Sequence, residues 1–177
     1  QIPSFRERFG VSGAVIGAVD IVKGLGVLLG LEVIRVPGAT GYLDTNYRGK
    51  GEAAAKALKR SDFVLVHVEA PDEAAHEGNV AEKVAAIERI DEFVLGPLLQ
   101  ARAKLGETAF LVMPDHLTPV TERTHVADDV PVLMARPGDL PDGLDSFSEE
   151  TAARGSIRLA EGWDLMGMFI GRTGPAP

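Results

Sequence analysis

The stretch FVLVHVEAPDEAAHEG, residues 63–78, decides the fold class that the sequence indicates. Its first half is a short, β-branched apolar run, which is typical of a parallel strand with both faces covered. Pro71 ends this run, and Asp72 and His76 follow at a spacing of four residues. In an open α/β sheet, ligands and catalytic groups gather beyond the carboxyl ends of the strands. We therefore take Asp72 and His76 as the first pair of candidate metal ligands.

A second predicted strand end repeats this arrangement. Residues 108–113 are apolar, Pro114 follows, and Asp115 and His116 come next. Between the two strands lies a segment with the period of an amphipathic helix, so a right-handed crossover predicts two parallel strands in one sheet. Both acid and imidazole pairs would then lie at the same sheet edge. The expected apolar face of the crossover helix consists of Val80, Val84, Ile87, Ile90, Val94 and Leu98, with a break at Gly96 and Pro97.

The remaining elements are expected from apolar period and turn residues. Residues 1–10 are expected to be irregular, and the apolar run 11–29 is interpreted as one buried helix rather than a membrane span. Asp20 and Lys23 inside that run would each cost about 2.5 to 3.5 kcal/mol in a bilayer. Further predictions are a strand over 31–36, an Ala-rich helix over 52–60, a strand over 130–135, and a terminal helix or strand over 163–170.

Two interpretations of Lys23 stay open. In the first, Asp20 caps the helix or forms a local ion pair while Lys23 reaches the surface. In the second, Lys23 faces an anionic ligand, although a lone Lys is a weak signal. His67, inside the predicted strand, is interpreted as a hydrogen-bonded structural histidine or as a group that supports a metal ligand.

Composition limits the class of protein. The 177 residues are 45% hydrophobic and fit one domain, 1–177. A net charge of -8 without a basic patch argues against nucleic acid and anionic membranes as partners. The absence of Cys excludes disulfides and thiolate chemistry and fits a cytoplasmic location. The sequence begins at Gln1 without a signal peptide, so its start is expected to lie inside a longer protein.

Three His and two Asp make a plausible metal centre. One carboxylate and two imidazoles from Asp72, His76 and His125 suit a borderline divalent cation and leave a position open for substrate. Asp115 and His116 form half of a second set. Two adjacent metal ions suit phosphoryl transfer, because one activates a hydroxyl nucleophile while both offset phosphate charge. Mn or Zn is the expected ion, with Mg and Co as alternatives.

Three segments carry a family resemblance: VPGATGYLDTNYRGKGEAA, VHVEAPDEAAHEG with AIERIDEFVLGPLL, and MPDHLTPVTERTH. They resemble the C-terminal part of archaeal-type cofactor-independent phosphoglycerate mutases, in the alkaline phosphatase superfamily. The resemblance implies an α/β fold with a mainly parallel sheet and helices on both faces. It also implies a two-metal enzyme that interconverts 2-phosphoglycerate and 3-phosphoglycerate through a phosphoserine. By this resemblance Asp72, His76 and His125 hold one metal, Asp115 and His116 hold the other, and Lys23 contacts the transferring phosphoryl group.

The resemblance also implies what these residues lack. The family's nucleophilic Ser, the Asp that completes its second metal site and its Arg-rich substrate insertion have no match here. We therefore expect the chain alone to be inactive and to form an oligomer or to need a missing N-terminal segment. Alternatives are a phosphatase or phosphonate-processing enzyme of the same superfamily, and a non-catalytic domain that uses its acidic edge for binding.

Overall fold

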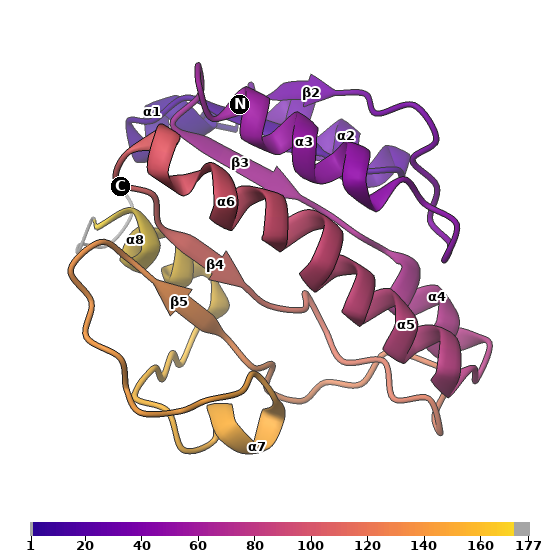
Figure 1. Ribbon diagram of the computed structural model, residues 1–177. Helices are drawn as coiled ribbons and strands as arrows, with labels where there is room; N and C mark the ends of the chain where they lie inside the picture. Colours follow the sequence, from indigo (N-terminus) through magenta and orange to yellow (C-terminus); the bar gives the residue numbers. More distant parts are fainter. Residues whose placement is uncertain (1, 172–177) are drawn as a thin grey trace. The chain divides into compact units, whose positions relative to one another are not determined.

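The computed structural model describes residues 2–171, which fall into two compact units. Unit 1 comprises Gln1–Gly106 and Thr118–Thr124, and unit 2 comprises Glu107–Leu117 and His125–Pro177. Figure 1 shows the helices and strands of both units. The candidate ligands are therefore distributed over both units.

A three-stranded parallel sheet forms the centre of unit 1, in the order β2-β1-β3. Its strands are β1 (Gly13–Ile16), β2 (Glu32–Ile34) and β3 (Phe63–Val66). Val15 of the central strand pairs with Val33 on one side and with Leu65 on the other. The strands predicted at 31–36 and 63–69 are thus confirmed, somewhat shortened.

The helix expected over 11–29 is wrong in its first part. β1 occupies its start, and only α2 (Asp20–Leu28) is helical. The reason is burial on both faces, because Ala14, Val15 and Ile16 are at most 1% exposed at the centre of the sheet. A strand that is covered on both faces has a continuous run of apolar residues. The spacing of these residues therefore does not distinguish such a strand from a buried helix.

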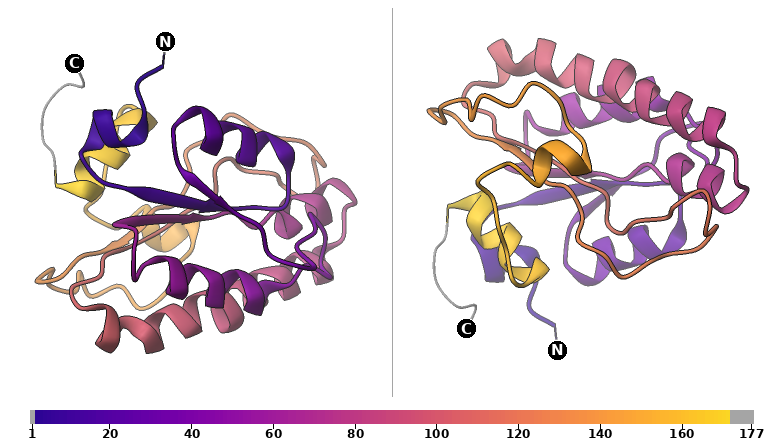
Figure 2. Two further views of the ribbon diagram at one scale, coloured as in Figure 1. Left: turned by 90° about the horizontal axis from the view of Figure 1, so that it is seen from above. Right: turned by 90° about the horizontal axis from the view of Figure 1, so that it is seen from below.

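Helices cover both faces of the sheet in unit 1. Figure 2 shows α2 on one face and α3 (Tyr47–Ala57) on the other, with α6 (Gly96–Leu105) outside α3. α3 begins five residues before the predicted start, because Asn46 caps it by accepting a hydrogen bond from the backbone of Gly49. α1 (Phe5–Phe9) occupies a segment expected to be irregular, and a Ser4 and Glu7 capping box explains it.

The predicted crossover helix is present but interrupted. α4 (Ala70–His76) precedes α5 (Val80–Ile90), a π-helical turn η1 (Asp91–Leu95) and α6. Asn79 caps α5 by accepting from the backbone of Glu82. The expected apolar face is only half correct: Val94 and Leu98 are buried, whereas Val80, Val84 and Ile87 are about half exposed or more. The π turn breaks the 3.6-residue period and separates the two stripes.

Unit 2 contains a two-stranded antiparallel sheet and short helices. β4 (Phe110–Val112) pairs with β5 (Leu133–Ala135). β4 forms an antiparallel ladder with β5, the next strand along the chain, while the predicted parallel pairing of residues 63–69 with 108–113 would join the two units and stays a prediction. The helices are α7 (Glu149–Ala152), the 3₁₀ turn η2 (Gly162–Asp164) and α8 (Leu165–Ile170), which settles the terminal stretch as helix. Among residues 2–171, no helix is long and apolar enough to cross a membrane.

Candidate metal centre

α4 brings two candidate ligands together in unit 1. Asp72 and His76 are one helical turn apart and therefore project from the same face. The Nε2 atom of His76 lies 3.3 Å from Oδ2 of Asp72. Ala70, Ala74 and Ala75 are buried on the opposite side, so the helix is fixed while its polar face stays partly open. The sequence predicted this pair but not the helix that carries it.

The His76 ring is oriented by a backbone carbonyl. Its Nδ1 atom lies 2.9 Å from the carbonyl oxygen of Arg123. A carbonyl oxygen only accepts, so Nδ1 carries a proton and donates. In the neutral ring, Nε2 then presents a lone pair toward the Asp72 carboxylate. An imidazole nitrogen and a carboxylate oxygen are both metal-binding groups, so the pair fits a divalent metal.

Arg123 has an unusual backbone that serves this contact. Its φ of 53° is the only positive φ of a non-glycine residue among those that the structure describes. The Arg123 side chain packs on Gly78, where an added Cβ would lie 2.5 Å from Nε. Gly78 itself has a φ of 76° and ends the turn that follows α4. The two residues hold the loop against the ligand helix.

Asp72 is held from the same loop. The Thr118 hydroxyl donates a short hydrogen bond to Oδ1 of Asp72. Lys83 of α5 donates from Nζ to the carbonyl oxygen of Thr118 at 2.6 Å. Thr118 is only 5% exposed, so this connection between α5, the loop and Asp72 is well shielded from water. The sequence analysis did not identify Thr118, Lys83 or the carbonyl of Arg123.

A buried lysine supports the end of β3. Lys50 of α3 is completely buried, and its Nζ donates to the carbonyl oxygen of His67 at 3.2 Å. Burial lowers the pKa of Lys50 to about 8, while the nearby Glu69 carboxylate acts in the opposite direction. Burial likewise raises the pKa of Glu69. Lys50 thus fixes the turn between β3 and α4, a role that the sequence analysis missed.

Unit 2 holds the other three candidate ligands. The rings of His116 and His125 have centroids 3.7 Å apart and planes inclined by 30°. Nε2 of His116 lies 3.6 Å from Oδ1 of Asp115, which also accepts a hydrogen bond from the His116 backbone. A bridge between Leu117 and Val126 closes the intervening loop at its base and explains why His116 and His125 meet. His116 and His125 can each offer one ring nitrogen to a metal ion.

Lys23, the remaining candidate, forms the expected local contact. Its Nζ lies 2.8 Å from Oδ1 of Asp20, one turn earlier on α2. This contact lowers the pKa of Asp20, through the hydrogen bond from Lys23 and its charge. The ion pair agrees with the first of the two interpretations of Lys23. It leaves a contact with phosphate untested.

Comparison with known families assigns this chain to a superfamily. The family model described as the Metalloenzyme superfamily matches residues 1–169. The chain belongs to this superfamily.

Curated relatives of this chain are named as phosphoglycerate mutases. The chain is 50% identical over 172 residues to a 2,3-bisphosphoglycerate-independent phosphoglycerate mutase of Methanosarcina acetivorans, covering 96% of this chain and 43% of the relative. It is 55% identical over 166 residues to the enzyme named phosphoglycerate mutase 2 in Methanothermobacter thermautotrophicus, with coverages of 94% and 41%. The chain thus spans about two fifths of the length of these curated relatives. Their names confirm the resemblance found in the sequence.

Solved structures agree with this metalloenzyme fold. A protein of Pyrococcus horikoshii matches with a TM-score of 0.86 at 28% identity, covering 100% of this chain and 54% of that one. A cofactor-independent phosphoglycerate mutase of Thermoplasma acidophilum matches with a TM-score of 0.73 at 31% identity, covering 98% and 40%. The predicted fold class is confirmed: an alkaline-phosphatase-like α/β fold whose parallel sheet is flanked by helices.

Proposed function

We propose that this chain is the metal-binding portion of a phosphoglycerate mutase that interconverts 2-phosphoglycerate and 3-phosphoglycerate through a phosphoserine. Both units belong, in this proposal, to the C-terminal portion of one catalytic domain in the cytoplasm. The names of the relatives support the substrate, and the superfamily supports the use of metal. The observation that carries the proposal is the approach of His76 Nε2 to within 3.3 Å of the Asp72 carboxylate, on a ring oriented by the Arg123 carbonyl.

The ligand assignment follows the sequence prediction. Asp72, His76 and His125 hold one divalent ion, Mn or Zn, while Asp115 and His116 contribute to a second. His116 and His125 are close in sequence to residues that contact the α4 ligands. His116 is two residues before Thr118, which bonds Asp72, and His125 is two residues after Arg123, which bonds His76. Each two-residue step spans at most about 7.6 Å between Cα atoms.

In the proposed site, the metal ions and the protein have different roles. Bound ions supply Lewis acidity for a hydroxyl nucleophile and offset phosphate charge. The protein orients the ligands: the Arg123 carbonyl fixes the His76 ring, and the Thr118 hydroxyl fixes one oxygen of Asp72. We assign Lys23 to the transferring phosphoryl group, a contact that requires it to exchange its Asp20 partner for phosphate.

Metal binding is tested most directly by thermal stabilisation. Mn²⁺ at about 100 times its dissociation constant stabilises a protein by about 2.7 kcal/mol, which is an easily measured rise in melting temperature. We expect Asp72→Ala and His76→Ala to abolish most of this rise. Asp145→Ala, which removes an exposed carboxylate, is the matched control and should retain it. An unchanged rise in both ligand variants would contradict the metal site and favour a non-catalytic binding domain.

Catalysis is tested on the longer protein and on this chain in parallel. The nucleophilic Ser is proposed to lie outside the 177 residues, so the chain alone should be inactive while the intact protein converts phosphoglycerate. Preference for an aryl phosphate over phosphoglycerate would instead favour a phosphatase. Serine-dependent mutase activity of the isolated chain would refute the assignment of the nucleophile. Light scattering on the isolated chain tests the expected oligomer, because β2 and β3 have open edges within the sheet of unit 1.

A further inference from the structure

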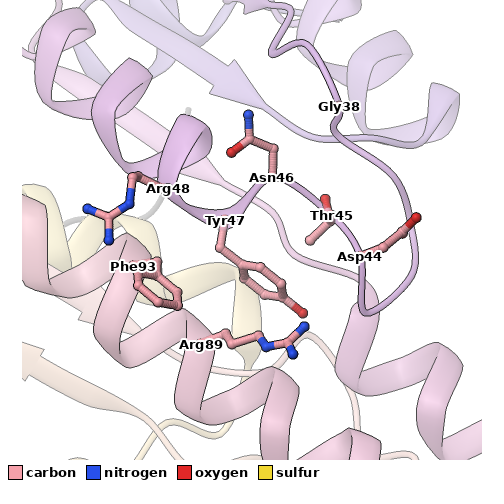
Figure 3. A pocket seen from close by; sticks show the side chains of 8 residues that line it. All are labelled: Gly38, Asp44, Thr45, Asn46, Tyr47, Arg48, Arg89 and Phe93. Carbon is pink, nitrogen blue, oxygen red and sulfur yellow. The ribbon is translucent and has the colours of Figure 1, made fainter.

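A second polar region of unit 1 lies at the start of α3. A shallow hollow of about 560 Å³ opens between the turn after β2, the first turn of α3, and the neighbouring α5 and η1. Figure 3 shows its lining side chains. None of the candidate metal ligands lines it. The lining residues are Gly38, Asp44, Thr45, Asn46, Tyr47, Arg48, Arg89 and Phe93.

Two arginines in the hollow lack an acidic partner. Among residues 2–171, neither Arg48 nor Arg89 forms an ion pair, although the chain has 26 Asp and Glu against 18 Lys and Arg. The carboxylate of Asp44 is engaged by the Thr40 hydroxyl at 2.6 Å. Two unneutralised guanidinium groups in a protein of net charge -8 are a local departure from its overall electrostatics.

Both guanidinium groups are held in place by neutral groups. Arg89 donates from Nη1 to the carbonyl oxygen of Leu43 at 2.8 Å. The Arg48 guanidinium lies over the ring of Phe93, 4.8 Å from its centroid. These contacts use little of the donor capacity of either side chain, because a guanidinium carries five N–H donors. The remaining donors are therefore pre-positioned for an acceptor.

Tyr47 adds a buried donor next to Arg89. The residue is 4% exposed, and its hydroxyl has no hydrogen-bond partner among the described residues. Figure 3 shows this hydroxyl beside the Arg89 guanidinium. Burial raises the pKa of Tyr47, the charge of Arg89 lowers it, and the charge of Asp44, which also lines the hollow, raises it. A buried polar group without a partner costs free energy, so natural sites supply a ligand or water for it.

We propose that the hollow binds a small oxyanion, a carboxylate or phosphate group that accepts from the Arg89 guanidinium and from the Tyr47 hydroxyl, which lie side by side in Figure 3. Charge-assisted hydrogen bonds from a fixed guanidinium fork are the strong and directional kind that this chemistry uses. The site is separate from the proposed metal centre and does not depend on it.

Titration of the metal-free protein tests the proposal. Inorganic phosphate and succinate are titrated separately in the presence of a chelator, with chloride adjusted to constant ionic strength so that screening does not change. We expect saturable binding of at least one of the two anions, and the two titrations distinguish a phosphate site from a carboxylate site. Absence of saturable binding for both would overturn the proposal.

Variants locate the binding. Arg89→Gln should weaken binding by about tenfold or more, since it removes a charge-assisted bond, whereas Arg48→Gln, whose guanidinium lies over the Phe93 ring, should weaken binding less. Arg102→Gln removes an equal charge from an exposed position on α6 and should bind as the wild type does. If Arg89→Gln unfolds, Arg89→Lys is the alternative, because it keeps the charge but loses the paired N–H donors of the guanidinium group. Tyr47→Phe tests the contribution of the hydroxyl. Wild-type affinity in the folded Arg89 variant or in Tyr47→Phe would overturn the site.

Discussion

Helix α3 contributes a cationic side chain to each of two regions. One region presents hydrogen-bond acceptors, and the other presents donors. Lys50 points to the turn between β3 and α4, where it donates to His67 and lies in the field of Glu69. Arg48, two residues earlier, lies in the hollow without a carboxylate partner among the described residues. Around α4 the ligand atoms are acceptors held by donors, whereas the hollow presents donors in excess. The same helix thus serves a region suited to cations and a region suited to anions.

This difference identifies the kind of ligand each region favours. At α4, the Arg123 carbonyl and the Thr118 hydroxyl fix His76 and Asp72 before any metal arrives. In the hollow, the arginines are fixed but the Tyr47 hydroxyl still lacks an acceptor. Preorganised acceptors stabilise cations, and preorganised donors stabilise anions. The following substitutions test whether the two regions really differ in this way.

The largest expected effect concerns Lys50. Because burial lowers its pKa from 10.5 to about 8, the unfolded chain binds a proton between these values that the folded chain does not. Stability should therefore increase as pH rises from about 8 toward 10.5, by an amount on the order of 3 kcal/mol. Urea unfolding at several pH values should show this rise in the wild type and its loss in Lys50→Met. Lys59→Met, at an exposed position, should keep it.

Gly78→Ala should be the next most costly change. A left-handed φ costs a residue with a Cβ about 1 to 2 kcal/mol, and the new methyl would also meet the Arg123 side chain. We expect a loss of about 2.5 kcal/mol by urea unfolding. Combining it with Arg123→Ala should recover the steric part, and Gly143→Ala, which has a positive φ and open space, should lack that part. Additive single and double variants would show that the two residues do not press on each other.

Thr118→Val tests the satisfied hydroxyl of the α4 region. The change keeps the shape but removes the bond to Asp72, so we expect a loss of about 1.5 kcal/mol in the free energy of unfolding. If the metal proposal holds, Mn²⁺ affinity should also fall by roughly 10- to 100-fold. Thr121→Val, in the exposed part of the same loop, is the control. Equal effects of the two changes would mean that the Asp72 contact contributes little.

The smallest effect is expected for Tyr47→Phe, the counterpart in the hollow. Its hydroxyl has no hydrogen-bond partner among the described residues, so its removal should leave stability unchanged or raise it by up to about 1 kcal/mol. Thermal and urea unfolding without added anion would measure this. A loss as large as that of Thr118→Val would show that the hydroxyl is already satisfied and would remove the contrast between the two regions.

Local signals in the sequence were sufficient for part of this picture. The strand at 63–66 was indicated by its β-branched run. Asp72 and His76 were singled out as a pair at a spacing of four residues, although the helix α4 that carries them was not predicted. In each of these cases the deciding interaction lies within a few residues of the signal, so no knowledge of the fold was required.

The rest depends on contacts between distant segments. Thr118 and Asp72 are 46 residues apart in sequence, and His76 and Arg123 are 47 apart. No local pattern marks a carbonyl oxygen as the partner of a particular imidazole. The error over 11–29 has a related cause, because β1 became a strand only through its two neighbours in the sheet. Lys50 was overlooked because its burial depends on packing rather than on its sequence context.

The wide turn at Asp91–Leu95 has a consequence for the helix that follows it. One surplus residue there leaves everything beyond it rotated by about 100° relative to an uninterrupted α-helix of the same length. Closing the turn into a regular α-helix, without deleting a residue, would bring Val94 and Leu98 into line with the apolar row before it. It would also turn the backbone of Phe93 and Val94 away from Gly51, where α3 now approaches so closely that a methyl group would not fit. The wide turn is therefore what allows this close approach of α3.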